Sequence, residues 1–556
     1  MLPRADAVAT LAREPFDVLV IGGGITGAGV ALDAATRGYS VALVERGDYA
    51  SGTSSRSSKL VHGGLRYLQN FDLGLVREAL LERQINAALA PHLVRPLPLI
   101  VPAFDGARPD RLTGLGLNMY DVMAVDRLSP LARRRDRNRD GIEDWSPSRH
   151  RVISGEEVAE LLPALAAREP SGGYLFYDCQ TDDSRLVLTV LAEAERFGAV
   201  AVNGVEATAL LEEGGRAIGA RVRDAGSGAE LEVRAANVVN ATGVWADRLR
   251  PEELHDEAEV PVIRPSRGTH IVLPAELLPL RAGAIAPAAG GSRIFVLPWL
   301  GRTLVGTTDN DYDGDIERVR PSDADVSHLL GAVNAFFATE LGAGDVAGAF
   351  AGVRPLISTG DPKKSVDISR KAELYETSSG MITITGGKLT TWRRMAKLAV
   401  DRIVERDGRE APCRTHEIPL GMAVEEAGLP RVEGVPDDAY GQLAGRYGYA
   451  ARDVLLLAAD RVELAGRILP GRPDLLAEAV YAARREQALR VADVLLRRTR
   501  LGLTDARALC AAGEQAPERV AGALGEELGW DAARRAAEAD AFRAEAEAEG
   551  IVVAAA

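Results

Sequence analysis

Three glycines and one acidic residue near the start of the chain have the spacing of a dinucleotide-binding motif. Gly22, Gly24 and Gly27 form a GxGxxG pattern directly after the apolar run FDVLVI, and Glu45 lies 21 residues after Gly24. The first glycine makes a tight turn, the second lets the backbone approach a pyrophosphate, and the third permits close packing of a helix on a strand. A carboxylate at Glu45 can accept hydrogen bonds from ribose hydroxyls. This combination predicts a dinucleotide site.

The pattern occurs once in the chain, which favours FAD over NAD. A flavin enzyme that also binds NAD(P)H would usually need a second copy, and none follows in the middle of the sequence. The segments ATG (241–243) and TGGKLT (385–390) are typical of turns that complete the same sheet from distant parts of the chain. A helix beginning near Leu389 would direct its positive end at the flavin pyrimidine ring, where charge develops on reduction.

A second group of reactive residues lies in the segment SSKLVHGGLRY, residues 57–67. Lys59, His62 and Arg66 surround two adjacent glycines, and no apolar run in the segment is long enough to form core. Histidine titrates near neutrality, and arginine binds phosphate oxygens through its planar fork. So many side chains that can carry a positive charge suggest that the segment binds an anionic partner.

Hydrophobic periodicity predicts the elements that position these residues. Phe16–Ile21 and Val41–Glu45 are apolar runs typical of buried strands, and the residues between them have helical spacing up to Gly38, so 16–45 form a predicted βαβ unit. Further helices are expected at 73–90 and 185–200, strands at 200–240 and 261–310, and a strand–turn–helix at 380–404. After about residue 405 the chain becomes rich in Ala, Leu, Glu and Arg at helical spacing.

Composition excludes several classes of protein. The chain has 556 residues and a formal net charge of −14, which argues against nucleic-acid binding as its main role. Its three cysteines have no metal-type spacing, so we expect no metal site and a reducing compartment. No window approaches the roughly 18 apolar residues that a spanning helix needs. A membrane contact, if there is one, would therefore be peripheral.

Several motifs together resemble one family of flavoproteins. VIGGGITGAGVALDAATRG, SSRSSKLVHGGLRYL, NATGVWAD, LPW followed by VGTTD, GVRPL and GGKLTTWR are similar to motifs of the FAD-dependent glycerol-3-phosphate dehydrogenase family. The later REQALRVADVLLRRTRLGL resembles the C-terminal helical domain of that family. The matching segments span residues 16 to about 503.

The resemblance implies an activity and a set of partners. The family oxidises sn-glycerol 3-phosphate to dihydroxyacetone phosphate by hydride transfer to flavin N5, and it passes the electrons to a membrane quinone. The enzyme would lie at the cytoplasmic face of the membrane as a peripheral protein, and a homodimer is compatible with the sequence. The arginine-rich run 133–139 or an amphipathic surface could supply the membrane contact.

The resemblance also assigns residues to the substrate. Arg354 in GVRPL and Arg370 in DISRKAEL match the phosphate-side arginines, Arg66 and Tyr67 match a substrate-facing pair, and Lys388 matches a residue beside flavin and substrate. Oxidation also requires a base for the hydroxyl proton. His270 resembles a substrate-side histidine and His62 more closely a flavin contact, but the sequence does not decide between His270, His62 and Lys388 as the base.

The cofactor would be held by the glycine motif, by the loop that follows the second strand and by the two late turns. SSKLVHGGLRY would wind past the flavin, with its cationic end facing a phosphorylated substrate. The expected FAD contacts are Gly22, Gly24, Ile25, Thr26, Gly27, Glu45, Arg46, Thr53, Ser54, Ser57, Ser58, Lys59, Leu60, His62, Gly63, Gly64, Thr242, Gly243, Gly387, Lys388, Leu389 and Thr390.

We therefore expect an α/β protein with a discontinuous FAD-binding domain of the glutathione-reductase type. This Rossmann domain would comprise 16–90, 170–260 and 350–404, a β-rich substrate domain would comprise 91–169 and 261–349, and a helical domain would comprise 405–556. Three alternatives remain at this stage: an oxidase of the same substrate that uses O₂, an amine oxidase of the same flavoprotein class, and a non-catalytic flavoprotein that binds RNA. The acidic balance argues against the last.

Overall fold

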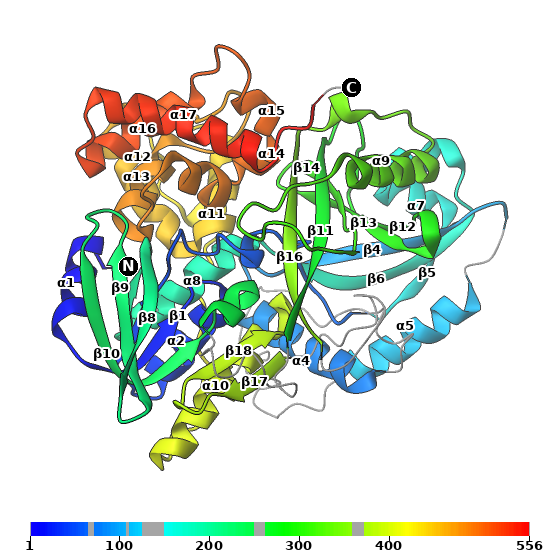
Figure 1. Cartoon of the computed structure of the whole chain (residues 1–556). Helices are drawn as coiled ribbons and strands as arrows, with labels where there is room; N and C mark the ends of the chain where they lie inside the picture. The colour runs from blue at the N-terminus through cyan, green and yellow to red at the C-terminus, as the bar shows by residue number, and fades with distance from the viewer. Residues whose placement is uncertain are drawn as a thin grey trace.

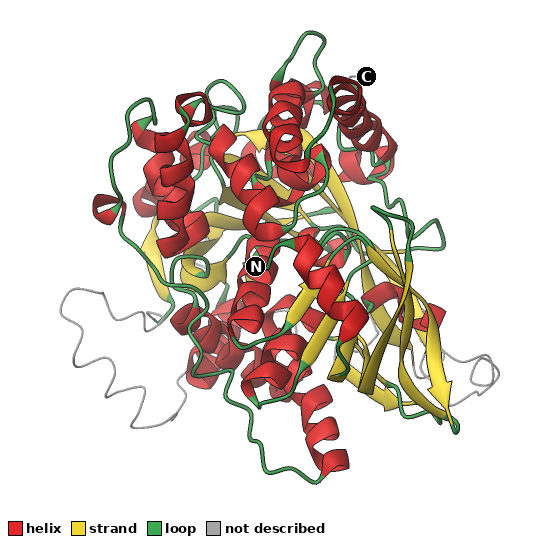
Figure 2. Ribbon diagram, turned by 90° about the vertical axis from the view of Figure 1, so that its left-hand side faces the viewer, coloured by secondary structure: helices red, strands yellow, loops and turns green. Residues whose placement is uncertain are grey.

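Two sheets and a helical C-terminal part make up the protein. The structure is a computed structural model that describes residues 2–64, 72–106, 110–124, 149–249, 262–358 and 372–554. One sheet lies below the C-terminal helices at the left of Figure 1 and the other lies at the right. In the view of Figure 2 the C-terminal helices lie at the top of the molecule.

The first sheet contains the predicted βαβ unit. Its strand order is β17-β18-β10-β1-β2-β7, with β1 (Phe16–Ile21) paired in parallel with both β2 (Val41–Val44) and the end of β10 (Glu230–Asn240). β7 (Val200–Val202) and β18 (Ile382–Gly386) extend the parallel part, and β17 (Ala372–Glu376) pairs antiparallel to β18. β1 and β2 are apolar on both faces because helices cover one face and a second layer covers the other.

Three helices from distant parts of the chain pack on one face of this sheet. α2 (Ile25–Thr36) lies between α8 (Asp183–Arg196) and α10 (Trp392–Asp407), which are separated in the sequence by about a third of the chain. α2 has almost no exposed residue, and a Cβ atom on Gly29 would lie 2.6 Å from the Trp392 ring. Glycine at this position therefore lets α2 and α10 approach closely.

A three-residue 3₁₀ turn, Leu389–Thr391, precedes α10, so the helix begins later than the Leu389 expected from the sequence.

The opposite face is covered by an antiparallel ribbon and the first helix. β8 (Val205–Glu213), β9 (Arg216–Asp224) and the first half of β10 form the meander expected between 200 and 240. α1 (Arg4–Arg13) packs with them over Leu19, Val44 and Val202. β10 thus serves two sheets, since its first half pairs with β9 and its second half pairs with β1.

The second sheet is larger and mostly antiparallel. Its order is β15-β11-β14-β13-β12-β4-β6-β3, with β16 added to β11 and β5 added to β6. Its strands are β3 (Leu60–Val61), β4 (Arg95–Ala103), β5 (Arg151–Ser154), β6 (Gly172–Gln180), β11 (Val262–Pro274), β12 (Gly283–Pro287), β13 (Arg293–Trp299), β14 (Arg302–Gly306), β15 (Asn310–Asp311) and β16 (Gly348–Ser358). α7 (Gly155–Leu161) and α9 (Asp323–Phe337) pack over one face, while α4 (Leu73–Leu89) lies near the junction with the first sheet and contacts α5 (Arg111–Ala124).

Sheet membership differs from the domain boundaries expected from the sequence. β6 was expected in the FAD-binding domain as part of 170–260, and β16 as part of 350–404, but both belong to the second sheet. β16 pairs with β11 from Val262↔Ser358 to Val272↔Gly348, so a boundary at 350 falls inside a strand. In both places, consecutive strands of the chain join different sheets: β6 and β16 join the second sheet, whereas β7 and β17, which follow them, join the first. Apolar periodicity predicts a strand but does not indicate which sheet it joins.

The C-terminal part is helical, as expected. It contains α11 (Asp437–Tyr447), α12 (Ala451–Asp460), α13 (Leu476–Glu486), a π-helical turn at Asp493–Arg498, α14 (Leu501–Thr504), α15 (Ala506–Leu509), α16 (Ala516–Leu528) and α17 (Ala532–Ala548). One core joins these helices to the second sheet, because Leu495 and Leu503 belong to the same buried cluster as Trp299 and Phe350. Among the helices of the described ranges, none combines the length and apolarity needed to cross a membrane.

Candidate active site

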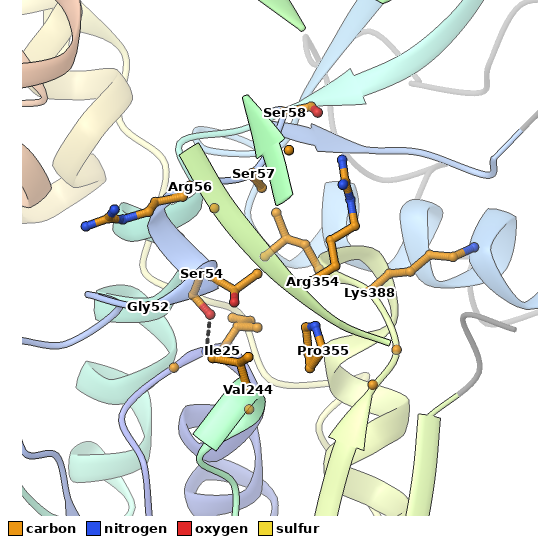
Figure 3. A pocket seen from close by; sticks show the side chains of 18 of the residues that line it. Ile25, Gly52, Ser54, Arg56, Ser57, Ser58, Val244, Arg354, Pro355 and Lys388 are labelled. Carbon is orange, nitrogen blue, oxygen red and sulfur yellow. Dashed lines mark hydrogen bonds between the residues drawn. The ribbon is translucent and has the colours of Figure 1, made fainter. Parts of the chain in front are cut away.

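A cavity of about 1470 Å³ is lined by residues of both sheets. It exceeds the roughly 300–1,000 Å³ of ordinary ligand pockets, so it has room for a long cofactor and a small second ligand. The glycine motif and Glu45 line one part of it, and His270, Arg354 and Lys388 line another. In Figure 3 the side chains of Arg354 and Lys388 extend away from Ser54 and Ile25.

The glycine motif has the geometry that its sequence predicts. Gly22 has φ +112°, and a Cβ atom there would lie 2.6 Å from the carbonyl oxygen of Ala241. A Cβ atom on Gly27 would lie 1.9 Å from the carbonyl oxygen of Gly22, so the first turn of α2 can approach the strand only with glycine. The turn therefore presents the N-terminal end of α2 to the cavity.

The loop after β2 contacts the N-terminal end of α2. Ser54 Oγ accepts a hydrogen bond from the Ile25 N–H at 3.0 Å, which is the dashed line in Figure 3. Thr53 Oγ1 donates to the carbonyl of Val353 at 2.6 Å and so ties this loop to β16. The loop lines the cavity between the two sheets, where the N–H groups of α2 and the serine hydroxyls form a set of donors suited to a pyrophosphate.

Glu45 lies at the end of β2 and is held by backbone groups. Its Oε2 accepts from the Gly23 N–H and its Oε1 from the Gly47 N–H, each at 2.7 Å. Burial raises the pKa of Glu45, and these two N–H donors oppose the increase. The carboxylate lines the cavity and is oriented before any ligand binds, which fits the recognition of a ribose hydroxyl pair.

An aromatic platform beside Glu45 was not foreseen from the sequence. The Arg46 guanidinium lies over the Trp245 ring at 4.6 Å, and Trp245 Nε1 donates to Glu317 Oε1 at 2.8 Å. Arg46 also forms an ion pair with Glu317. Trp245 belongs to the motif NATGVWAD, so the signal was present, but that motif does not indicate that its tryptophan reaches the cavity.

Most residues expected to hold the cofactor line this cavity, whereas Gly27, Lys59 and Gly63 are outside the lining in the described part of the chain. The Lys59 ammonium is buried under the loop and donates to Asp183 Oδ2 at 2.7 Å and to the Ser55 carbonyl at 2.6 Å. The Lys59 side chain is thus engaged by protein groups, and a cofactor contact at this residue stays a prediction. The lining includes Gly22, Gly24, Ile25, Thr26, Glu45, Arg46, Thr53, Ser54, Ser57, Ser58, Leu60, His62, Gly64, Thr242, Gly243, Gly387, Lys388, Leu389 and Thr390.

Arg354 projects from β16 toward the cavity and is held by the turn after β14. Its Nη2 donates to Thr307 Oγ1 at 3.0 Å and to the Thr308 carbonyl at 3.2 Å, and its Nη1 lies 3.4 Å from Asp309 Oδ1. These three residues belong to the VGTTD motif, for which the sequence had suggested no individual role. A Cβ atom on Gly268 would lie 2.5 Å from Arg354 Nη2, so the neighbouring strand leaves room for the guanidinium.

His270 lies on β11 with its ring fixed on both faces. It stacks on Phe350 with a centroid distance of 4.8 Å, and a Cβ atom on Gly306 would lie 2.2 Å from its Cδ2 atom. Its Nε2 atom is 2.9 Å from Ser58 Oγ, which lines the cavity. Burial, followed by the charges of Lys59 and Arg354, lowers the pKa of His270 well below 6.5. The imidazole is therefore neutral at pH 7.

His62 is placed differently from His270. Its backbone N–H donates to Thr390 Oγ1 at 3.1 Å, and its ring meets the Phe295 ring edge-on at 6.3 Å. The contact with Thr390 joins the segment SSKLVHGG to the turn before α10. His62 and Lys388 both line the cavity. The segments SSKLVHGG and TGGKLT, which the sequence had singled out separately, therefore lie beside the same cavity as the glycine motif. Arg66, Tyr67, Arg370 and the run 133–139 lie outside the described residues.

Known proteins are similar to this chain in sequence over most of its length. The family described as FAD dependent oxidoreductase matches residues 17–402, and that described as the C-terminal domain of alpha-glycerophosphate oxidase matches 382–535. Glycerol-3-phosphate dehydrogenase 2 of Mycobacterium tuberculosis is 38% identical over 98% of this chain and 90% of its own length. The mitochondrial glycerol-3-phosphate dehydrogenase of Rattus norvegicus is 36% identical over 94% of this chain and 71% of its own length.

A solved structure agrees with both the sequence relatives and the geometry. The glycerol-3-phosphate dehydrogenase of Bacillus halodurans, in complex with FAD, superposes with a TM-score of 0.77 at 29% identity and covers 100% of this chain and 99% of its own. The glycine turn, the oriented Glu45 and the size of the cavity fit FAD as the cofactor. With its α/β FAD-binding domain, β-rich second domain and helical C-terminal domain, the chain belongs to the FAD-dependent glycerol-3-phosphate dehydrogenase family.

Proposed function

We propose that the protein is a respiratory dehydrogenase that oxidises sn-glycerol 3-phosphate to dihydroxyacetone phosphate and delivers the electrons to a membrane quinone. One observation carries the substrate assignment: Arg354, Lys388 and His270 line the same cavity as the dinucleotide motif. FAD, when bound, supplies the acceptor for the hydride that leaves C2 of the substrate. The family relationship described above supports the choice of substrate.

Two cations define the phosphate end of the proposed substrate site. A dianionic phosphate requires fixed positive charge, and the Arg354 guanidinium is fixed by Thr307 and the Thr308 carbonyl. Lys388 lies at the turn that precedes α10 and adds a second cation to the lining. Arg66, Tyr67 and Arg370 are assigned to the same ligand by resemblance alone.

We assign the role of the base that accepts the substrate hydroxyl proton to His270, in preference to His62 and Lys388. A base must be unprotonated before it acts, and the low pKa of His270 ensures this at pH 7. Nε2 is the ring nitrogen that meets a hydroxyl of the cavity lining. A bound phosphate dianion would offset the charge of Arg354 and so raise the basicity of the ring when substrate is present.

Anaerobic titration of the purified holoenzyme tests the reaction. Glycerol 3-phosphate should bleach the flavin absorbance stoichiometrically, whereas glycine and sarcosine should leave it unchanged, because cationic Arg354 and Lys388 match a dianion better than a lone carboxylate. Bleaching by an amine substrate instead would favour an amine oxidase. No bleaching by glycerol 3-phosphate in a protein that retains FAD would reject the proposed function.

The electron acceptor is tested separately. An oxidase would use O₂, and the match of the C-terminal helices to the domain described for alpha-glycerophosphate oxidase makes this the second candidate. We expect ubiquinone or menaquinone analogues to reoxidise the enzyme faster than air-saturated buffer does. Stoichiometric H₂O₂ without quinone turnover would instead identify an oxidase.

The proposed location is the cytoplasmic face of the membrane, where the quinone is available to a peripheral enzyme. Cosedimentation with vesicles that contain anionic lipid tests the contact, and binding should weaken as salt screens the basic segments. Light scattering at several protein concentrations tests the homodimer. Failure to bind vesicles at low salt would remove the peripheral assignment and leave the oxidation of the substrate unaffected.

A further inference from the structure

Three arginines of the C-terminal part reach out of their own domain toward the active site. Arg497, Arg498 and Arg500 follow α13 in the sequence RRTR, and their side chains are 6%, 0% and 0% exposed. The segment that carries them contacts α8, above which it lies in Figure 1. Besides partners in the C-terminal part, they pair with acidic residues in the loop between β2 and β3 and at the start of α8, and these contacts cross between domains.

Arg500 holds the part of this loop that reaches the substrate. Its Nη2 atom donates to Asp183 Oδ1 at 2.5 Å and to the Ser55 carbonyl at 3.0 Å. Lys59 Nζ donates to the other carboxylate oxygen of Asp183 and to the same Ser55 carbonyl. Two cations therefore share one carboxylate and one carbonyl, and both the Arg500 and Lys59 side chains are fully buried.

Asp183 passes this restraint to the cavity lining. Its Oδ2 atom accepts from the Ser57 N–H at 3.1 Å and from the Ser57 hydroxyl at 2.7 Å. Lys59 occupies the left-handed region, at φ +60°, directly after Ser58. The turn 57–59 is thus fixed at its first residue by Asp183 and at its last residue by the Lys59 ion pair. Ser57 and Ser58 both line the cavity, as Figure 3 shows.

Two contacts connect the turn to His270. The Ser58 hydroxyl meets His270 Nε2 at 2.9 Å, and the Lys59 ammonium lies 4.7 Å from the centre of the Phe350 ring on which His270 stacks. Buried ion pairs contribute little net stability, because the cost of removing the charges from water offsets their attraction. The main contribution of this cluster is therefore the conformation that it imposes on the turn.

We infer that Arg500 is a positioning residue of the active site: through Asp183 it fixes the turn 57–59 and thereby the orientation of Ser58 and His270. The inference gives the C-terminal domain a role in the chemistry, and it rests on the proposed function of His270. Among the residues that the structure describes, Arg500 is outside the cavity lining and does not contact His270, Arg354 or Lys388, so its effect on them passes through the turn.

The test compares Arg500→Met with a matched control, Arg37→Met. Arg37 is equally buried and pairs with Asp33 at 2.5 Å, but it lies at the C-terminal end of α2, away from the turn. For holoenzyme with full FAD content, stopped-flow reduction by glycerol 3-phosphate should have a limiting rate at least about tenfold lower in Arg500→Met. The half-saturating concentration should change less than about threefold, because Arg354 and Lys388 are intact.

Hydrogen–deuterium exchange supplies a measurement independent of turnover. The peptide that contains Ser57–Lys59 should exchange faster in Arg500→Met than in the parent, whereas Arg37→Met should leave that peptide unchanged even if its melting temperature falls equally. If Arg500→Met does not fold, Arg500→Lys serves in its place. A lysine retains the charge but has one nitrogen, so it cannot also make the contacts of Arg500 Nη1 with the Leu496 carbonyl and of Nε with Asp182. The limiting rate of this variant should still fall by about threefold or more.

A double-variant cycle shows whether the effect passes through His270. In the His270→Gln background, Arg500→Met should produce little further loss of limiting rate, since the group that it positions is already absent. Fully additive losses, or an unchanged limiting rate in the folded Arg500 variant, would overturn the inference. Parent enzyme that glycerol 3-phosphate does not reduce would reject the proposed function instead, so the two failures are distinguishable.

Discussion

The two ends of the cavity are constructed in different ways. The nucleotide end depends mainly on the glycine turn and on Glu45, within the continuous stretch 16–45, in which two strands pair and one helix packs on them. The proposed substrate end would depend on side chains of His270, Arg354 and Lys388, which line the cavity from three segments far apart in the sequence. A short stretch can therefore specify cofactor binding almost alone, whereas substrate chemistry requires the complete assembly of both sheets.

This difference predicts how each end responds to substitution. At the nucleotide end a single added methyl group meets rigid backbone and cannot be accommodated. At the substrate end the backbone tolerates a change, but the loss of one charge or one proton acceptor removes a specific function. Substitutions at the substrate end should therefore reduce the rate or the affinity while FAD stays bound.

The largest effect is expected at His270. His270→Gln retains a polar side chain that can meet Ser58 but removes the ring nitrogen that accepts a proton. We expect the limiting rate of flavin reduction to fall by about 10²- to 10⁴-fold, the usual contribution of general acid–base catalysis. FAD content and melting temperature should stay near those of the parent. A variant that reduces its flavin at the parental rate would move the base to His62 or Lys388.

A smaller but still large effect is expected at Arg354. Arg354→Ala removes a fixed guanidinium from the phosphate end, so the half-saturating concentration of glycerol 3-phosphate should rise by about 100-fold. Arg302 is the matched control, because its ion pair with Asp505 faces the C-terminal part. Arg302→Ala should leave the half-saturating concentration near the parental value. Equal sensitivity of the two variants would contradict a phosphate contact at Arg354.

At the nucleotide end, a substitution that clashes with the backbone should weaken FAD binding. Gly27→Ala places a methyl group 1.9 Å from the Gly22 carbonyl oxygen, and the required shift should cost about 1–3 kcal/mol and release FAD. Gly331→Ala is the matched control, because Gly331 also lies within a helix but the added atom meets open space in the described structure. That substitution should stabilise α9 by about 0.5–1 kcal/mol. Thermal unfolding and FAD fluorescence measure both.

The same difference explains what the sequence could predict. The βαβ unit was predictable because GxGxxG, Glu45 and the apolar runs all act over short distances. The position of Lys59 was not, since its partner Asp183 is 124 residues away, Arg500, which shares that carboxylate, is 441 residues away, and nothing local marks the ion pair. Likewise, the VGTTD motif was visible, but its contact with Arg354 depends on how β16 joins β11. The substrate residues were predicted from resemblance, because local patterns could not indicate them.

The smallest predicted effect tests whether the nucleotide end also depends on residues far away in the sequence. Asp48, in the loop that follows Glu45, is bound by Arg498 at 2.6 Å and by Arg497 at 2.5 Å, so one part of this end depends on the C-terminal domain. Burial alone would raise the pKa of Asp48, but the charges of Arg498 and Arg497 outweigh it and lower the pKa from 3.8 to about 2.

A carboxyl group with a lowered pKa stabilises the folded state above its unfolded pKa, and this stabilisation is lost as the pH falls through the folded value. Between about pH 4 and pH 2 the parent should therefore lose about 2 kcal/mol of unfolding free energy that Asp48→Asn does not lose, because the amide does not titrate. Urea unfolding at several pH values measures the difference, with Asp437→Asn, a fully exposed position, as the control. If the parent and Asp48→Asn lose stability in parallel with acid, the interdomain pair does not hold this loop, and the nucleotide end is as local as its sequence motif.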